Sequence, residues 1–177
     1  MAFNAILKAA EKDIFDEWFD RFCSTYGPDT MWRFKNSTDP FHNPVGVNTR
    51  KSLSELLGLL LHGGSLESAA GVIDPIVRIR AIQKFTASQA VAFFIELKDI
   101  VHKLLKKKDL ETYAADLYTF DSQVDTLMLL AFDAYTLCRE EISRLRVDTE
   151  RKKIYKAFSR AGLLDITEEE KALLEED

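Results

Sequence analysis

Three observations predict an all-α fold, a six-helix bundle with one long carboxy-terminal helix. Apolar residues recur at three- and four-residue steps along most of the 177 residues, and this spacing places them on one face of a helix. Capping residues followed by proline, or by glutamine three positions on, mark helix starts, and glycines mark helix ends. No segment alternates apolar and polar residues with β-branched enrichment, so no strand is predicted.

The amino-terminal half predicts three longer helices, one short helix and a connecting loop. An apolar stripe indicates a first helix over residues 3–25, and Gly27, Pro28 and Asp29 then predict a stop followed by a loop to residue 42. A second helix is expected over residues 44–62, because Asn43 suits the cap, Pro44 suits the first helical position and a Gly-Gly pair follows. After a short helix over 65–70, Asp74 and Pro75 predict the start of a third helix that ends near residue 85.

The carboxy-terminal half predicts two further helices and a tail. Thr86 and Gln89 form a capping box before a helix that runs to about residue 105. A long helix is expected from about residue 110 to 160, where apolar residues step alternately by three and four. Thr167 and Glu170 predict a short, loosely ordered acidic helix within residues 161–177. Residues 1–160 are therefore interpreted as a single domain followed by this tail.

Charge and composition limit the classes of function. The formal net charge is −5, from 24 basic and 29 acidic residues, and seven of the acids lie within residues 161–177, so the body is close to neutral. Such a body offers no broad basic surface for nucleic acid. The apolar runs are far shorter than the roughly 20 residues of a membrane span, and the amino terminus lacks the pattern of a secretory signal. We expect a cytoplasmic protein without a membrane span.

No catalytic or metal-binding motif is present in the sequence, so we expect a protein that is not an enzyme and has no cofactor. A haem-binding or other small-ligand sensor is an alternative, with His102 as the axial ligand. His102 is better explained as a residue at the solvent edge, beside an ion pair between Asp99 and Lys103 one helical turn apart. A helix-turn-helix DNA-binding regulator that uses Arg78 and Arg80 is a second alternative. The helix that would read the bases begins without Arg or Lys, which disfavours this alternative.

Two segments are the best candidates for a ligand- or partner-binding site. The first is a proline-containing loop that leads into the second helix. The second is a group of arginines and amides at a helix junction, where these side chains could also satisfy helix ends and loop carbonyls. The candidate binding residues are Phe41, Asn43, Arg78, Arg80, Gln83, Ser88 and Gln89.

These segments resemble the RsbRD amino-terminal domain family of stress-response co-antagonists. The resemblance rests on Phe41-x-Asn43-Pro44-Val45-Gly46, on residues 76–83, on Ser88-Gln89-Ala90 and on Leu97-Lys98. It implies a helical sensor domain for signal transduction in the stress response, related in role to sensor domains that are globin-like, dimeric and without haem. A globin-like fold is therefore expected as an alternative to the six-helix bundle. In that class a STAS domain follows the sensor, whereas this sequence ends after the acidic tail. We therefore expect a stand-alone module that regulates a separate protein partner.

The long helix offers a candidate dimer face. Its apolar stripe can pair with a second copy across a two-fold axis, or it can complete the core of a single chain. The residues of this face are Leu117, Phe120, Val124 and Leu127.

Overall fold

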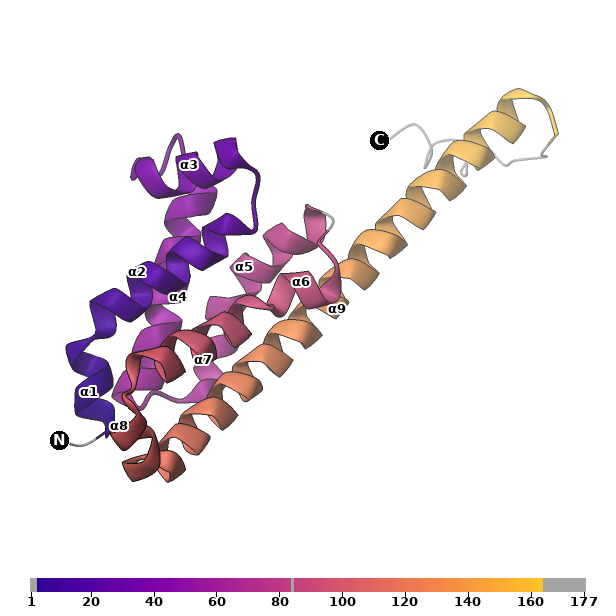
Figure 1. Ribbon diagram of the computed structural model, residues 1–177. Coiled ribbons are helices and arrows are strands. Elements are labelled where there is room, and N and C mark those ends of the chain that lie inside the picture. The colour runs from indigo at the N-terminus through magenta and orange to yellow at the C-terminus, as the bar shows by residue number, and fades with distance from the viewer. Residues whose placement is uncertain (1–2, 84, 164–177) are drawn as a thin grey trace. The chain divides into compact units, whose positions relative to one another are not determined.

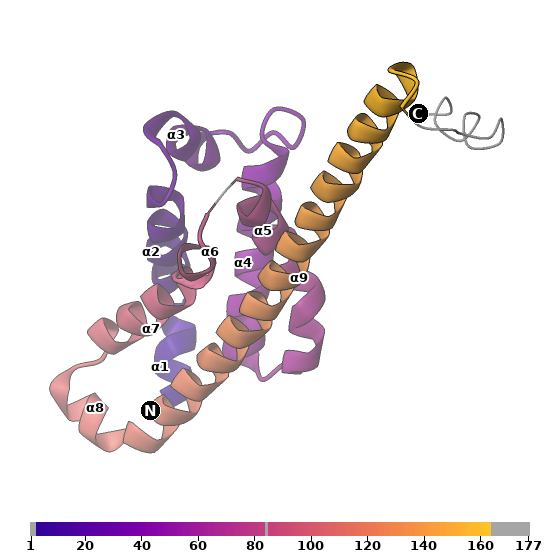
Figure 2. The ribbon, with the colours of Figure 1, turned by 90° about the vertical axis from the view of Figure 1, so that its right-hand side faces the viewer.

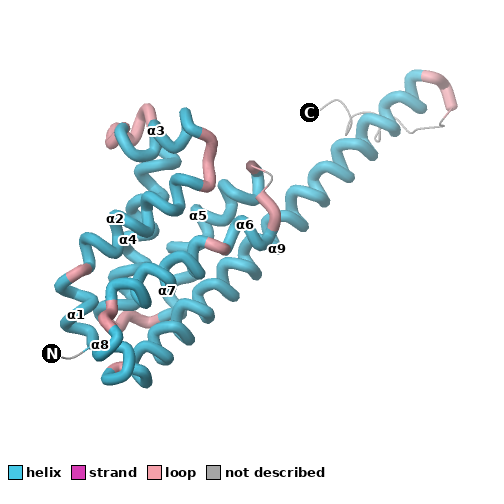
Figure 3. Tube along the Cα trace, viewed as in Figure 1, coloured by secondary structure: helices cyan, strands magenta, loops and turns pink. Residues whose placement is uncertain are grey.

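The protein is all-α, as predicted. The computed structural model describes residues 3–83 and 85–163, and it contains helices but no strand within that range (Figure 1, Figure 3). The terminal helix predicted after Thr167 lies outside the described residues. The chain divides into two compact units, Met1–Leu137 and Cys138–Asp177.

The predicted first helix is two helices, α1 (Phe3–Ala9) and α2 (Glu11–Ser24), which are separated at Ala10. Ala10 leaves the helical region at φ −105° and ψ 9°. The interruption changes the direction of the chain, so that Phe3 and Leu7 of α1 and Trp18 of α2 are all buried.

The segment predicted as a loop contains a further helix, α3 (Pro28–Asn36). Gly27 is extended and Pro28 occupies the first turn, where its missing N–H costs nothing. The Gly-Pro-Asp sequence therefore starts a helix as well as ending the previous one, and the buried Phe34 anchors this helix. α3 packs on both α2 and α4 (Figure 2).

α4 (Pro44–His62) has the predicted bounds, and Gly63 ends it in the left-handed conformation with φ 77°. A 3₁₀ turn, η1 (Leu66–Ser68), leads directly into α5 (Ala69–Ile82), so the third helix begins earlier than Pro75 indicated. Burial of Ala69 and Ile73 against the rest of the first unit outweighs the proline signal, since tertiary packing overrides local preference.

The helix predicted over residues 87–105 is also two helices, α6 (Ala87–Val91) and α7 (Phe93–Leu104). The capping box at its start is confirmed, because Thr86 Oγ1 accepts from Gln89 N–H and Gln89 Oε1 accepts from Thr86 N–H. The helix is interrupted between α6 and α7, and this interruption places Phe93 beside Trp18. The indole N–H of Trp18 donates to the Phe93 carbonyl over 2.6 Å. α2 and α7 pack side by side around this contact.

Two helices complete the described chain, α8 (Lys107–Thr112) and α9 (Ala114–Arg160). α9 is the predicted long helix, and it continues through residues 147–149 without interruption. Within the first unit, Lys98 and His102 of α7 contact Asp125 and Asp121 of α9 at 2.9 Å each.

Ion pairs reinforce the α2–α7 contact. Arg21 of α2 contacts Glu96 at 2.7 Å and Asp99 at 2.6 Å on α7, and Lys103 contacts Asp99 at 2.7 Å. Hydrogen bonds from Lys103 and then Arg21 hold the pKa of Asp99 below its ordinary value. An aspartate with a lowered pKa in the folded state favours folding only while it is ionised.

We predict that Asp99→Asn reduces the pH dependence of stability at low pH. The wild-type advantage is full above the unfolded pKa of about 3.9 and is lost as the pH falls through the lower folded pKa. Urea unfolding between about pH 6 and about pH 2 should show the gap between the two proteins closing. Asp133→Asn, at an exposed aspartate of α9, is the control. A constant gap across this pH range would contradict the prediction.

Candidate functional site

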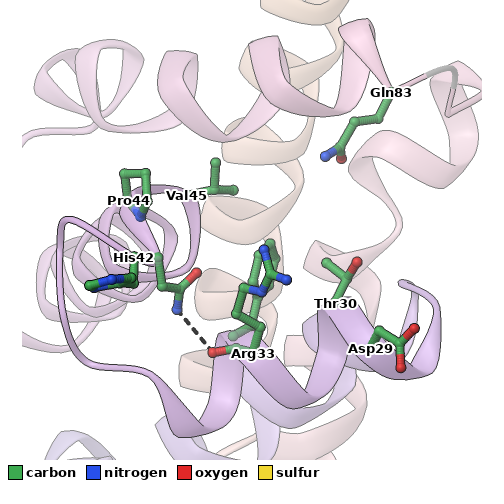
Figure 4. A pocket seen from close by; sticks show the side chains of 9 residues that line it. Asp29, Thr30, Arg33, His42, Pro44, Val45 and Gln83 are labelled. Atoms are coloured by element: carbon green, nitrogen blue, oxygen red, sulfur yellow. Dashed lines mark hydrogen bonds between the residues drawn. The ribbon is translucent and has the colours of Figure 1, made fainter.

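An open pocket of about 210 Å³ lies between α3, the loop into α4 and the end of α5. We call it the α3–α4 pocket. It brings together Asn43 and Gln83, one from each of the two segments that the sequence singled out (Figure 4). Its lining comprises Asp29, Thr30, Arg33, Phe34, His42, Asn43, Pro44, Val45 and Gln83.

Asn43 builds the pocket by joining α3 to α4. Its Nδ2 donates to the Arg33 carbonyl over 3.0 Å and to the Ser37 carbonyl over 2.8 Å, and its Oδ1 accepts from Gly46 N–H over 3.1 Å. The side chain is 2% exposed. All three bonds are to backbone groups, so Asn43 positions the pocket wall. Its side-chain amide is already used in these bonds.

The Asn43-Pro44-Val45-Gly46 motif has a physical explanation in this geometry. Asn43 caps α4, and Pro44 begins the helix at a position where no N–H is needed. Gly46 is necessary because a Cβ there would overlap the Asn43 side chain. The motif therefore specifies how the chain enters α4, and it does not by itself supply a reactive group.

The loop between α3 and α4 has its own hydrogen bonds. Asp39 Oδ1 accepts from Phe41 N–H over 2.9 Å, and Asp39 Oδ2 contacts His42 Nδ1. The contact with His42, followed by the Phe41 N–H bond, lowers the pKa of Asp39. This bonded loop presents Phe41 outward, with 91% of its surface exposed.

Arg80 is not available to a ligand or partner, contrary to the expectation from the sequence. It is fully buried, and its guanidinium donates to the Gln89 carbonyl over 2.9 Å and to Thr25 Oγ1 over 2.9 Å. Its central carbon lies 3.9 Å from the centroid of the Phe22 ring. Burial lowers the pKa of Arg80. This arrangement matches the alternative in which such side chains satisfy helix ends and carbonyls.

The remaining candidate binding residues lie outside the pocket lining. Arg78 is exposed and pairs with Asp74 over 2.8 Å, one turn away on α5. Ser88 and Gln89 are exposed at the start of α6, where Gln89 belongs to the capping box. The alternative of DNA binding through Arg78 and Arg80 is weakened, because Arg80 is buried in the core and cannot contact DNA.

The structure also shows where the candidate dimer face and His102 lie. Leu117, Phe120, Val124 and Leu127 are at most 8% exposed within the single chain, so they belong to its core. His102 is at the solvent edge, and its Nε2 lies 2.9 Å from Asp121 Oδ2, a contact that occupies the nitrogen a haem iron would need. The predicted Asp99–Lys103 pair is present.

Sequence reasoning missed the α3 side of the pocket, namely Asp29, Thr30, Arg33 and Phe34. These residues lie in the segment that was interpreted as a loop. The signal that could have found them is Pro28 followed by Asp29, which is typical of a helix start as well as of a turn.

The described residues contain no group of three or more His, Cys, Asp or Glu side chains arranged to hold a metal ion. No helix in the described ranges is long and apolar enough to cross a membrane.

Fold and site together define a helical domain with a small open pocket beside a hydrogen-bonded loop. The chain belongs to the family described as the RsbT co-antagonist protein rsbRD N-terminal domain, whose model matches residues 12–149. This family assigns it to the regulatory domains of stress signalling, as the resemblance implied.

An uncharacterised protein of Archaeoglobus fulgidus is 31% identical over 90 residues, which is 50% of this chain and 56% of the relative. The match therefore spans about half the length of that curated relative. No solved structure matches the chain.

We predict that Asn43→Ala lowers the free energy of unfolding by about 2–3 kcal/mol, because it removes a helix cap and two further, partly buried hydrogen bonds to the Arg33 and Ser37 carbonyls. Urea unfolding measures the loss. Asn48→Ala, at an exposed position within α4, is the matched control and should change stability by less than about 0.5 kcal/mol. Equal losses in the two variants would show that Asn43 does not join α3 to α4.

Proposed function

We propose that this chain is a non-catalytic signal-sensing module that regulates a separate protein partner in stress signalling. The observation that supports this function best is Phe41, a large aromatic side chain that is 91% exposed on a hydrogen-bonded loop. A pocket for a small signal lies behind the same loop.

Phe41 has the properties of a docking anchor. Aromatic side chains contribute much of the binding energy of protein interfaces, and a loop that is already ordered loses little conformational entropy on binding. The Asp39 bond to Phe41 N–H and the Asn43 bonds on either side of the loop supply this order.

We propose binding rather than catalysis on the chemistry of the pocket lining. Thr30 is the one hydroxyl residue there, and its hydroxyl makes no hydrogen bond among the described residues, either to the neighbouring Asp29 or to His42, whose ring contacts Asp39 instead. A nucleophile without an adjacent base is a weak catalyst.

We also propose a cytoplasmic location. Cys23 and Cys138 are both free and buried, a state that suits a reducing compartment. Burial raises the pKa of Cys23 to about 11, which keeps this thiol protonated and unreactive.

A photo-crosslinking amino acid at position 41 tests the partner-binding role. In cells of the source organism, the full-length protein carrying p-benzoylphenylalanine at Phe41 should crosslink to one identifiable polypeptide. The same amino acid at Tyr118, which is 76% exposed on α9, should not. The purified partner should then bind Phe41→Ala about tenfold or more weakly than wild type. Equal binding by Phe41→Ala would refute the anchor.

We further propose a homodimer, formed through the second unit. In residues 138–160 of α9, Leu145 is 59% exposed and Ile154 is 56% exposed, and Val147 and Phe158 are exposed as well. A single helix cannot bury apolar side chains against itself, and a second copy of the same helix can cover them.

Sedimentation equilibrium tests the dimer. Wild type should sediment as a dimer, and Ile154→Lys should raise the dimer dissociation constant about tenfold or more, because it places a charge in an apolar contact. Leu129→Lys, at a residue 62% exposed in the first unit, should leave the dimer intact. A monomeric wild type, or an unaffected Ile154→Lys, would exclude this interface.

A further inference from the structure

We infer that the α3–α4 pocket binds a small monocarboxylate with an apolar body. This inference rests on the proposed sensing function and names the chemical class of its signal. It follows from three properties of the pocket: polar groups without partners, an apolar part of the lining, and the charges at its rim.

The pocket holds polar side chains with no partner among the described residues. The Arg33 guanidinium makes no hydrogen bond or ion pair there, and neither does the Gln83 amide or the Thr30 hydroxyl. Arg33 extends from α3 and Gln83 from the end of α5 toward the same space (Figure 4). A guanidinium binds a carboxylate with two parallel N–H donors, and an amide N–H or a hydroxyl beside it can add a further donor.

Part of the lining is apolar and the space is small. Phe34, Pro44 and Val45 line it, and they can cover the hydrocarbon part of a ligand. The volume of about 210 Å³ lies below the roughly 300–1,000 Å³ of pockets that bind drug-sized molecules. A single carboxylate on a short aliphatic chain or one aromatic ring fits these limits.

The charges at the rim favour one negative charge on the ligand over several. Asp29 lines the pocket one helical turn before Arg33, and the two do not form an ion pair. An aspartate at this place repels a second carboxylate or a phosphate dianion. The His42 ring is engaged by Asp39, so it does not offset this repulsion.

The pocket is connected to the exposed loop through Asn43. Asn43 donates to the carbonyl of Arg33, the residue that would bind the carboxylate, and to the carbonyl of Ser37, where the loop begins. A ligand held by Arg33 therefore stabilises one arrangement of α3 and of the loop that presents Phe41. A ligand that binds one conformation more tightly shifts the population toward it.

Benzoate is the probe, and benzamide is its neutral counterpart of nearly the same shape. Benzoate should raise the unfolding temperature of the full-length protein in proportion to its concentration, and isothermal titration should give a saturable dissociation constant. Benzamide and inorganic phosphate should bind at least about tenfold more weakly, because one lacks the charge and the other is opposed by Asp29.

Arg33→Gln tests the residue, and it should weaken benzoate binding about tenfold or more. Arg144→Gln, which removes an exposed arginine from the second unit, is the control with the same charge change. Gln83→Ala should weaken binding by a smaller factor and serves if Arg33→Gln alters the unliganded melting curve. Nuclear magnetic resonance shifts on benzoate addition should centre on residues 29–45 and on Gln83.

Three results would overturn the inference: no binding of benzoate to wild type, equal binding of benzoate and benzamide, or unchanged binding by Arg33→Gln. These outcomes are separable from failure of the proposed function. A crosslinked partner at Phe41 with no benzoate binding would exclude the ligand class and leave the partner-binding role. Benzoate binding with no crosslinked partner at Phe41 would exclude the partner-binding role and leave the ligand class.

Discussion

The packing of the first unit depends on a buried positive charge, the guanidinium of Arg80. Removing such a group from water costs several kcal/mol, and no carboxylate is among its hydrogen-bond partners in the described chain. Backbone carbonyls of α6, the Thr25 hydroxyl and the faces of Phe22 and Phe93 take the place of a counter-ion. These partners come from α2, α6 and α7, so the charge is tolerated only when all three helices are in place.

This constraint extends to the pocket through the chain. Gln83 follows Arg80 by three residues at the end of α5, and the position of Arg80 therefore determines where the Gln83 side chain emerges. On the other side, Asn43 determines where α3 stands relative to α4. Two buried polar residues thus position exposed polar residues without partners. Asn43 bonds to backbone groups, and the two terminal nitrogens of Arg80 bond to carbonyls and to Thr25, while its Nε is buried without a hydrogen bond among the described residues. On the proposal made above, stability and recognition are carried by neighbouring but different side chains.

The sequence predicted those parts of the fold whose signals are local. Asn43, Pro44 and Gly63 delimit α4 correctly, and Thr86 with Gln89 forms the capping box, because caps depend on residues only a few positions apart. The break at Ala10 was not predictable, since it serves packing between distant helices. Arg80 looked like a binding residue because nothing local reveals that four aromatic rings surround it. The sequence analysis did not predict α3, so it also missed Arg33 and the α3 side of the pocket.

The position of the pocket suits regulation better than a site in the centre of the bundle would. A ligand buried among α2, α4 and α7 would have to disturb close-packed aromatic residues, such as Trp18 and Phe93, before any surface changed. The α3–α4 pocket instead shares the loop of residues 37–43 with Phe41, and the hydrogen bonds of Asn43 link the two. On the function proposed above, the pocket and Phe41 are therefore coupled through one side chain, and a ligand that binds one arrangement of the loop more tightly shifts the population of the loop that presents Phe41.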